Sequence, residues 1–250
     1  MRGSNTVDFA VVPTELRHAE GIYDVVRLAN GYPTDRYCHC INAQSVAEQL
    51  ERFPQGQFVA VTYEDGGEKV VGMGTTMLTR RTPGEATLPW YRMIGSFGLR
   101  NHDPEGDWLY GVELAVHPDY QRQGIGSALY KARLGLIDEF GLKGWYAGGM
   151  LMGYYDHRDE MTPVEYAHAV IRGDIVDPTV SMQLKNGLKP RGVIEEYYPE
   201  WKAGHAAVLL VYEGEGVNRS KRSLRPRVGL RSEGALERRV PTTFSADRTR

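Results

Sequence analysis

Leu114-Ala115-Val116-His117-Pro118-Asp119-Tyr120-Gln121-Arg122-Gln123-Gly124-Ile125-Gly126-Ser127-Ala128-Leu129 is the stretch that decides the fold of this 250-residue chain. An apolar run leads into it from Trp108 and ends at Pro118, which predicts a strand over residues 108–116. The amphipathic pattern after it predicts a helix over residues 126–140, ended by Gly141. The stretch is therefore a strand–turn–helix unit whose turn, residues 121–126, is rich in glycine; we call it the glycine turn.

The glycine turn has the properties of an anion site. The first N–H groups of a helix lack partners inside the helix, and the helix dipole is positive at that end. Gly124 and Gly126 have no Cβ, so a phosphate can approach the backbone closely. Arg122 either adds a charge-assisted contact or points to solvent. The turn could thus cradle a phosphate group.

Two widespread phosphate-binding motifs do not fit this turn. The dinucleotide fingerprint needs a third glycine three residues after the second, and position 129 is Leu. A Walker loop needs Gly-Lys followed by Ser or Thr, a run that the sequence does not contain. What remains is a pyrophosphate turn preceded by Val116-x-Pro118-x-x-Gln121.

The rest of the chain alternates between the two kinds of periodicity. Further strands are predicted over residues 7–12, 57–63, 69–79, 144–150, 193–198 and 206–213, and further helices over residues 14–30, 43–53, 162–172 and 178–185. Residues 82–107 follow no regular pattern, but their aromatic side chains argue for an ordered loop that could wall a substrate pocket, as could residues 153–177. This order predicts an α/β (α+β) domain over residues 1–214 with a mixed, partly antiparallel sheet.

The last part of the chain differs from the body in charge. Residues 217–250 hold ten Lys and Arg against Glu233, Glu237 and Asp247, so they carry +7 while residues 1–216 carry −9. We expect residues 215–250 to form a basic, disordered tail, which either binds nucleic acid or an acidic partner or has no partner at all. The acidic body suits a cationic substrate, or only keeps the protein in solution.

Composition excludes several classes of protein. No run of about 18 apolar residues is present and the N-terminus has no apolar signal core, so we expect no membrane span and a cytoplasmic location. Cys38 and Cys40, in the order Cys-His-Cys, are too close for an unstrained disulfide and poorly spaced for zinc. We therefore expect no metal site.

The stretch from Leu114 to Leu129 resembles the signature motif of the GNAT superfamily of N-acetyltransferases. The resemblance couples Val-x-Pro and Gln-x-x-Gly-x-Gly to the right strand and helix flanks, and the element order fits as far as about Gly214. A more specific resemblance over residues 109–213 is to the acetyltransferase domains found fused to carbon–nitrogen hydrolases. It rests on Asp107-Trp108-Leu109-Tyr110-Gly111, Ala147-Gly148-Gly149, Asp177-Pro178 and Gln183-Leu184-Lys185-Asn186-Gly187. No hydrolase domain is present in this sequence, and the substrates of that group do not carry over.

The resemblance implies a mostly antiparallel sheet of about seven strands, with a V-shaped splay between the central strands that receives the pantetheine arm of acetyl-CoA or another acyl-CoA. The arm would pair with the strand backbone like an added strand. A backbone N–H near Leu114 would face the thioester carbonyl and stabilise the oxyanion. The cofactor-binding residues it implies are Leu114, Ala115, Val116, Gln121, Arg122, Gln123, Gly124, Ile125, Gly126, Ser127 and Asn186, the last of which is otherwise a helix cap.

Acetyl transfer to an amine needs a base, because an amine of pKa about 10 is mostly protonated at neutral pH. Glu113 lies beside the expected thioester, where the superfamily often has an acidic residue, and is the candidate base or amine anchor; the alternative is a structural carboxylate. The family often has a tyrosine acid four residues before the glycine of its last helix, but counting back from Gly187 gives Gln183. Tyr154 and Tyr197 are weaker candidates for that acid.

Two functions stay open at this point. The first is N-acetyl transfer from acetyl-CoA by direct transfer in a ternary complex, to a small-molecule amine or a peptide amino group, by a monomer or homodimer. The second is a non-catalytic acyl-CoA-binding or regulatory module, which Gln183 in place of tyrosine favours. A longer acyl chain is a variant of the first. Nucleic acid is expected as a partner only through the basic tail.

Overall fold

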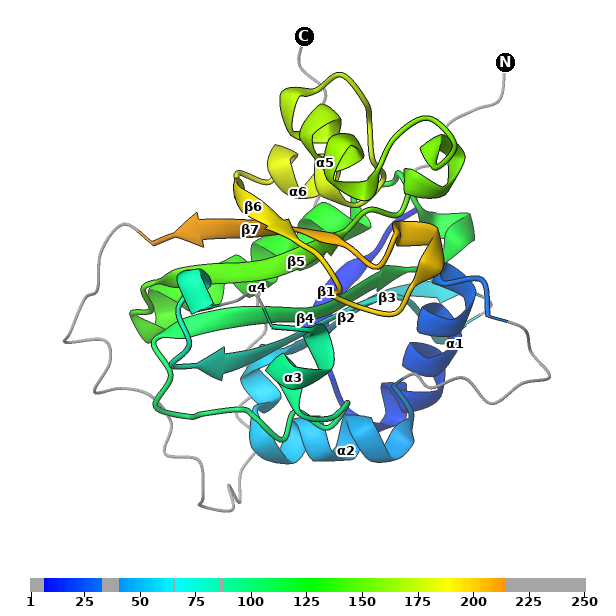
Figure 1. Cartoon of the computed structure of the whole chain (residues 1–250). Coiled ribbons are helices and arrows are strands. Elements are labelled where there is room, and N and C mark those ends of the chain that lie inside the picture. The colour runs from blue at the N-terminus through cyan, green and yellow to red at the C-terminus, as the bar shows by residue number, and fades with distance from the viewer. Residues whose placement is uncertain (1–6, 33–40, 65, 86–87, 215–250) are drawn as a thin grey trace, which may run out of the picture. The chain divides into compact units, whose positions relative to one another are not determined.

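The structure is a computed structural model that describes residues 7–32, 41–64, 66–85 and 88–214. The predicted tail over residues 215–250 and the Cys38-His39-Cys40 run lie outside the described residues. The elements, in chain order, are β1 (Ala10–Pro13), η1 (Leu16–His18), α1 (Ala19–Ala29), α2 (Ala43–Arg52), η2 (Pro54–Gly56), β2 (Gln57–Glu64), β3 (Gly67–Thr79), η3 (Pro83–Glu85), α3 (Trp90–Ile94), β4 (Trp108–Val116), η4 (Pro118–Tyr120), α4 (Ile125–Phe140), β5 (Gly144–Met150), η5 (Tyr154–His157), α5 (Pro163–Arg172), α6 (Val180–Lys185), β6 (Lys189–Ile194), η6 (Trp201–Ala203) and β7 (Ala207–Glu213) (Figure 1).

Seven strands form one mixed sheet in the order β1-β2-β3-β4-β5-β7-β6. Antiparallel pairing joins β1 to β2, β2 to β3, β5 to β7 and β6 to β7, whereas β4 and β5 run parallel. The mixed fold class, the strand number and the mostly antiparallel pairing predicted from the sequence are thereby confirmed.

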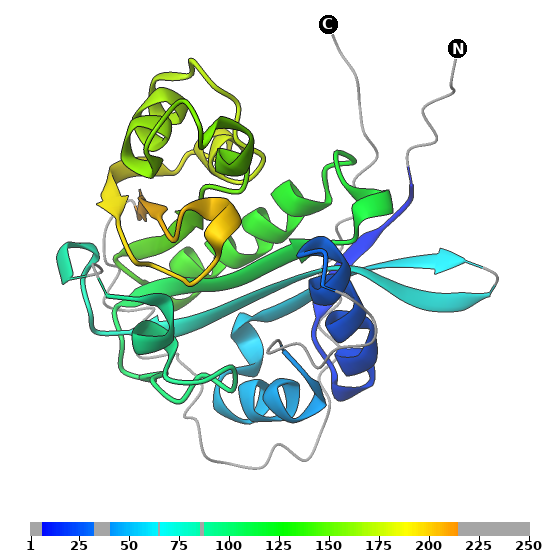
Figure 2. The same ribbon diagram turned by 45° about the vertical axis from the view of Figure 1, so that its right-hand side comes forward.

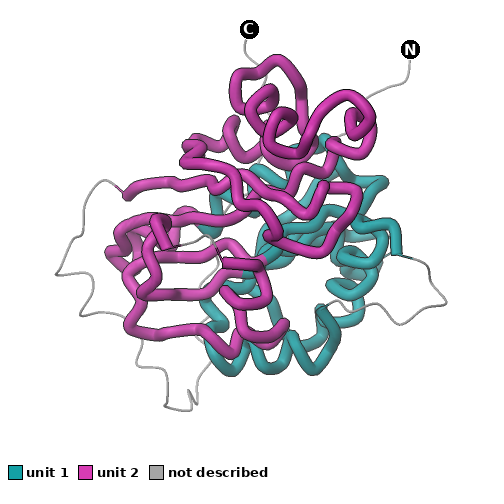
Figure 3. The backbone as a smooth tube through the Cα atoms, viewed as in Figure 1, with its two compact units in different colours: residues 1–75, 113–133, 226–250 teal, residues 76–112, 134–225 magenta. Residues whose placement is uncertain are grey.

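The chain divides into two compact units, coloured in Figure 3. Among the described residues, unit 1 holds those up to residue 75 and residues 113–133, and unit 2 holds residues 76–112 and 134–214. The chain runs from one unit to the other within β3, β4 and α4. The single domain predicted over residues 1–214 remains a prediction.

The core of unit 1 joins β2, β3 and the start of α4. Its buried members are Ala60, Val71, Tyr120, Ile125 and Leu129. Gly72 of β3 lets α4 approach, because a Cβ at Gly72 would lie 2.9 Å from Cγ2 of Ile125 and 3.2 Å from Cδ1 of Leu129. A glycine on β3 therefore sets how closely the first turns of α4 lie on the sheet.

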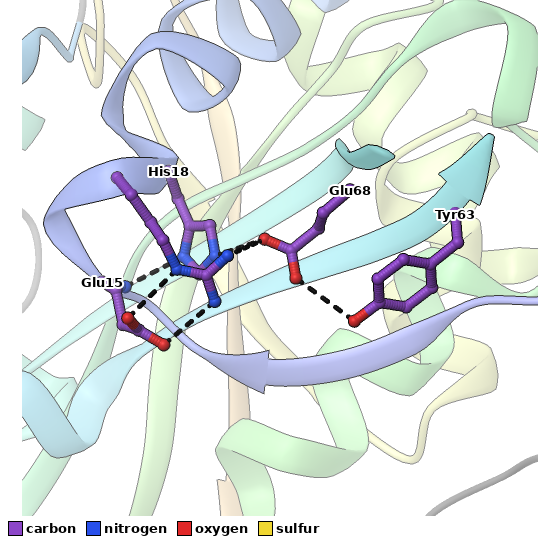
Figure 4. A network of polar contacts seen from close by, with 5 residues as sticks. Glu15, His18, Tyr63 and Glu68 are labelled. Carbon is purple, nitrogen blue, oxygen red and sulfur yellow. Dashed lines mark hydrogen bonds and ion pairs between the residues drawn. The ribbon is translucent and has the colours of Figure 1, made fainter. Parts of the chain in front are cut away.

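A polar network fixes the start of α1 to β3 in unit 1 (Figure 4). His18, 2% exposed, accepts a 2.9 Å hydrogen bond from the backbone N–H of Glu15 at Nδ1, and its Nε2 lies 3.1 Å from Oε1 of Glu68. In the neutral ring Nε2 therefore carries the proton and donates to Glu68. Arg17 and Tyr63 donate to the same carboxylate. Beyond this anchor, the β2–β3 hairpin end projects past α1 (Figure 2).

Unit 2 has its own aromatic core. Trp90, Tyr110, Tyr146 and Tyr197 pack there with Met77, Met93, Ile94 and Leu99. Trp90 belongs to α3, a helix inside the segment 82–107 that the sequence predicts as irregular. The segment was predicted as an ordered loop without regular structure, and the absence of a helix was wrong, because five residues are too few to establish a helical period.

Pairing between β4 and β5 stops early. The parallel register covers only Trp108–Tyr110 against Gly144–Tyr146, although both strands continue. Gly111 directly follows Tyr110, the last paired residue of β4, and Trp145 directly precedes Tyr146, the last paired residue of β5. A Cβ at Gly111 would lie 2.1 Å from the Trp145 ring. A glycine in β4 thus makes room for a tryptophan of β5 beside the end of the paired stretch, and the splay implied by the family resemblance stays a prediction.

Most predicted elements are observed with ends within three residues of the prediction. The helix predicted over residues 14–30 begins as η1 at Leu16 and becomes α1 only at Ala19, and one strand is displaced. The sequence predicts the partner of the last strand over residues 193–198, but β6 spans Lys189–Ile194. Glu196 adopts a positive φ of 52°, and the N–H of Tyr197 donates to the carbonyl of His205. The apolar residues after β6 therefore belong to a turn that packs into the core of unit 2, which period-2 patterning cannot distinguish from a strand.

Candidate active site

The glycine turn has an unusual backbone. Arg122 has a φ of 60° and Gly124 a φ of 89°, and a Cβ at Gly124 would have no heavy atom within 4 Å. The N–H of Ala128 donates to the carbonyl of Gly124, so the N–H groups of Ile125 and Gly126 precede the internal hydrogen bonds of α4. Space beside Gly124 and a long helix behind it fit the pyrophosphate of an acyl-CoA.

The β2–β3 hairpin holds the chain just before the turn. The N–H of His117 donates to the carbonyl of Val71 over 2.9 Å. Tyr120, 7% exposed, donates its hydroxyl proton to Glu64 and accepts from Nζ of Lys69 over 2.9 Å. Tyr120 and Lys69 thereby hold the pKa of the Glu64 carboxyl below its ordinary value.

The two glutamines of the turn act on the protein backbone. Nε2 of Gln121 donates to the carbonyl of Val116 over 3.1 Å, and Oε1 of Gln123 accepts from the N–H of Val7 over 3.1 Å. Both side chains brace the turn from within unit 1. Their predicted role in binding pyrophosphate would then fall to their backbone N–H groups.

Glu113 is the chemically distinctive residue of β4. Its side chain is half-buried. Burial raises the pKa of its carboxyl to about 7, against the opposing effects of the Leu114 N–H and the Arg133 guanidinium. A carboxyl that titrates near neutrality is suited to take a proton from an amine. The predicted base thus has the electrostatic property that the role requires.

The N–H of Leu114, expected to face a thioester carbonyl, hydrogen-bonds the carboxylate of Glu113 in this structure. Ala115 is buried and Leu114 and Val116 are half-buried beside the start of α4. The predicted oxyanion donor therefore stays a prediction, one that requires the Glu113 carboxylate to move when a thioester occupies its place.

Arg133 is a residue of this site that the sequence reasoning missed. It is 1% exposed, and its Nη1 donates to the carbonyl oxygen of Glu113 over 3.2 Å. The signal was present, because Arg133 lies four residues from both Leu129 and Ile137 on the apolar stripe of α4. A charge on that stripe is uncommon and marks a buried polar contact.

In unit 2, Gln183 occupies the position where the family often has a tyrosine. It is 4% exposed and lies against β5, since a Cβ at Gly149 would lie 2.1 Å from its Oε1. Asn186, the C-cap of α6, donates from Nδ2 to the carbonyl of Met182 over 2.8 Å. Its helix-capping contact is observed, and its cofactor contact stays a prediction.

The two tyrosine candidates for an acid have structural contacts in unit 2. The hydroxyl of Tyr154 donates to the carbonyl of Met161 over 3.1 Å. The hydroxyl of Tyr197 lies 2.9 Å from that of Tyr110, and burial raises the pKa of Tyr110 well above its ordinary value. A proton on this tyrosine pair is therefore held tightly, which does not favour release to a thiolate.

Two features are absent from the described residues. They contain no group of three or more His, Cys, Asp or Glu side chains placed to hold a metal ion. No helix among them is both long and apolar enough to cross a membrane.

The segment that holds the glycine turn matches a known family by sequence. Residues 22–151 match the acetyltransferase (GNAT) family. The chain belongs to this family. The matched segment runs from within α1 through β5, and therefore includes Glu113, the glycine turn and Arg133.

Two relatives come from Bacillus subtilis (strain 168). The probable hydrolase YhcX is 35% identical over 157 residues, which cover 63% of this chain and 30% of YhcX. The uncharacterized N-acetyltransferase YkwB is 26% identical over 168 residues, which cover 67% of this chain and 73% of YkwB. The chain thus spans less than a third of YhcX, as the resemblance to hydrolase-fused acetyltransferase domains predicts.

Solved structures share the fold at low identity. The loading GNATL domain of CurA from Lyngbya majuscula superposes with a TM-score of 0.66 at 18% identity, covering 82% of this chain and 97% of that domain. The GNAT-like decarboxylase GphF, in complex with isobutyryl-CoA, gives a TM-score of 0.64 at 18% identity, covering 82% of this chain and 98% of GphF. At these identities the likeness concerns the fold.

Proposed function

We propose that this protein is an N-acyltransferase that moves an acetyl group from acetyl-CoA to an amine by direct transfer in a ternary complex. The observation that carries the proposal is the half-buried Glu113 carboxyl, whose pKa burial raises to about 7, on the strand that leads into the glycine turn. A base tuned to neutral pH and an anion-binding helix start are the two parts that acetyl transfer needs most.

The roles divide between the elements of unit 1. The backbone N–H groups at Ile125 and Gly126 would hold the pyrophosphate at the start of α4. Glu113 would accept the proton of the incoming amine as nitrogen attacks the thioester carbonyl. The carbon–sulfur bond then breaks, and the thiolate leaves with a pKa near 8.5, low enough to depart without a strong acid. Gln183 in place of tyrosine is compatible with this step.

Release of free thiol from acetyl-CoA, measured across a panel of small amines and peptides, tests the proposal. We expect release with at least one acceptor and a loss of about a hundredfold or more in Glu113→Gln. Binding of acetyl-CoA without thiol release for any acceptor would instead support a non-catalytic acyl-CoA-binding module, which the absence of a tyrosine at position 183 favours.

Two glycines of the same helix region offer a matched test of the turn. Gly124 has a positive φ and Gly135 does not, and a Cβ at either position would meet no atom within 4 Å. Gly124→Ala should strain the turn and weaken acetyl-CoA binding about tenfold or more, whereas Gly135→Ala should leave affinity unchanged and stabilise α4 by about 0.5–1 kcal/mol. Equal affinities in calorimetry would remove the pyrophosphate assignment.

The finer features follow from the same proposal. The acceptor is a small-molecule amine or a peptide amino group, for which the acidic body supplies an attractive field. Acetyl is the acyl group we favour, and a longer acyl chain would show as a higher rate with that thioester in the same assay. We propose a cytoplasmic location and a monomeric or homodimeric state.

A further inference from the structure

Arg133 is a costly residue for the place that it occupies. It stands in the third turn of α4 with its side chain 1% exposed. Burying a guanidinium costs several kcal/mol unless its contacts compensate, and an apolar side chain would suit the same helical stripe. A packing role alone therefore does not account for an arginine here.

The neighbours of Arg133 are shaped to admit its guanidinium. A Cβ at Gly74 of β3 would lie 3.2 Å from Nε and 3.3 Å from Cδ of Arg133, so a glycine gives the side chain its room. The ring of Tyr130, one turn earlier on α4, lies 4.4 Å from Cζ. That distance is within the range of a cation–π contact. All of these groups belong to unit 1.

We propose that Arg133 is a positioning residue of the acyl-transfer site, whose guanidinium fixes the Glu113–Leu114 peptide and thereby aims both the Glu113 carboxylate and the Leu114 N–H. The inference rests on the proposed function of Glu113 as the base. It adds a residue that would never touch the substrate.

Peptide geometry carries the argument. The carbonyl of Glu113 and the N–H of Leu114 belong to one planar peptide group, so a hydrogen bond that orients the carbonyl also orients the N–H. Arg133 donates to that carbonyl over 3.2 Å. The N–H of the same peptide group acts on the Glu113 carboxyl and lowers its pKa. Donation by a charged group also polarises the peptide and strengthens its N–H as a donor.

Charge adds a second consequence. Arg133 lowers the pKa of Glu113 while burial raises it. Loss of Arg133 should therefore do two separable things: it should raise the pKa of Glu113, and it should loosen the peptide that carries the base. An arginine that only packed would share the first effect through its charge, so loosening of the peptide is the consequence that marks a positioning role.

Three variants test the role. Arg133→Met removes charge and donors, and Arg133→Lys restores the charge on a shorter, non-planar group. Gly74→Ala leaves Arg133 intact but presses on its guanidinium. Arg52→Met is the control, because Arg52 pairs with Glu48 over 3.0 Å on α2, within the same unit.

The titration midpoint of Glu113, followed by carbon NMR of the labelled carboxyl, needs no turnover. We expect Arg133→Met to move it above the wild-type value of about 7, and Arg133→Lys to restore most of the difference. In kinetics, Arg133→Met and Gly74→Ala should lower kcat by about tenfold or more while KM for acetyl-CoA changes by less than about threefold. Arg52→Met should match wild type in both measurements.

Two results would overturn the inference: an unchanged Glu113 midpoint in a folded Arg133→Met, or kcat within about twofold of wild type in both Arg133→Met and Gly74→Ala. If Arg133→Met does not fold, Arg133→Lys and Gly74→Ala decide in its place. A wild-type protein that releases no thiol would refute the proposed function alone. The Glu113 midpoint and the hydrogen-exchange rate of the Leu114 amide would still decide whether Arg133 fixes the peptide.

Discussion

Glu113 in unit 1 and Asp177 in unit 2 are two carboxylates that differ in burial and in the number of hydrogen-bond donors around them. Asp177 is fully buried; its Oδ1 accepts from the N–H groups of Thr179 and Val180, and its Oδ2 from the N–H of Gly153 and the hydroxyl of Tyr166. Glu113 is half-buried, receives the N–H of Leu114, and has its pKa raised by burial to about 7. A carboxylate supplied with four donors organises the chain around it, whereas one left short of donors stays available for proton transfer.

The largest effect that we expect comes from Glu113→Gln. It should lower kcat/KM for the amine by about 10²- to 10⁴-fold, because a general base contributes about that much. In wild type, kcat/KM should rise with pH to half its plateau near the Glu113 pKa of about 7, and the variant should lack that limb. An acceptor amine of low pKa keeps the amine's own titration away from this range.

Stability provides the counterpart of the same test. Since the folded-state pKa of Glu113, about 7, lies above its ordinary value of 4.5, the folded protein holds this proton more tightly than the unfolded chain does. Wild-type stability should therefore fall as pH rises from about 4.5 to about 7, and Glu113→Gln should be more stable at pH 8 by about 1–3 kcal/mol. A stability loss in denaturant titrations at pH 8 would make Glu113 a structural carboxylate like Asp177.

Asp177→Asn should have the opposite effect on stability from Glu113→Gln and should leave the pH dependence of activity unchanged. The amide presents two hydrogens where the carboxylate accepted from backbone N–H groups, so at least one donor loses its acceptor in a buried place. We expect a loss of about 2–4 kcal/mol in the free energy of unfolding, with the pH profile of kcat/KM unchanged in the fraction that folds. Urea titrations of Asp177→Asn and of the exposed control Asp174→Asn measure the loss in the free energy of unfolding. A shifted pH profile of kcat/KM would contradict the purely structural role of Asp177.

These two carboxylates also mark what the sequence can and cannot predict. Periodicity and turn chemistry gave the strands Trp108–Val116 and Gly144–Met150 with their observed ends, and the helix α4 within one residue. Glu113 was predicted as the candidate base from its place on the strand. The environment that tunes its pKa was not, because burial and the Arg133 contact depend on tertiary packing. Asp177 attracted notice only through a family resemblance, since two of its four donors, Gly153 and Tyr166, are distant in the sequence.

His18 tests whether hydrogen bonding or the unit in which a residue lies separates structural residues from functional ones. It lies in unit 1 with Glu113, but its polar atoms have hydrogen-bond partners like those of Asp177. Both ring nitrogens have partners, the Glu15 N–H and the Glu68 carboxylate (Figure 4). His18→Ala should cost about 2–3 kcal/mol of stability and leave the titration of Glu113 unchanged. The exposed neighbour Tyr63→Phe should cost less than about 0.5 kcal/mol. A His18→Ala variant of wild-type stability would show that its contacts are worth no more than those of a surface residue.

Substitutions of Arg122 should change stability and affinity least of all, and they separate backbone strain from cofactor binding. Its φ of 60° costs about 1 kcal/mol for a residue with a Cβ, so Arg122→Gly should stabilise the folded protein by roughly that amount. If the guanidinium also contacts the pyrophosphate, the same variant should bind acetyl-CoA more weakly, while Arg122→Lys should keep both the strain and most of the affinity. Arg122→Ala separates the terms, because it retains the strain and loses the charge. Weaker acetyl-CoA binding in both Arg122→Gly and Arg122→Ala, with higher stability in Arg122→Gly alone, would show that Arg122 binds the cofactor at a cost in stability. Glu113 is the other residue for which we expect this. Unchanged acetyl-CoA affinity in all three Arg122 variants would indicate that the backbone at the start of α4 binds the pyrophosphate without Arg122.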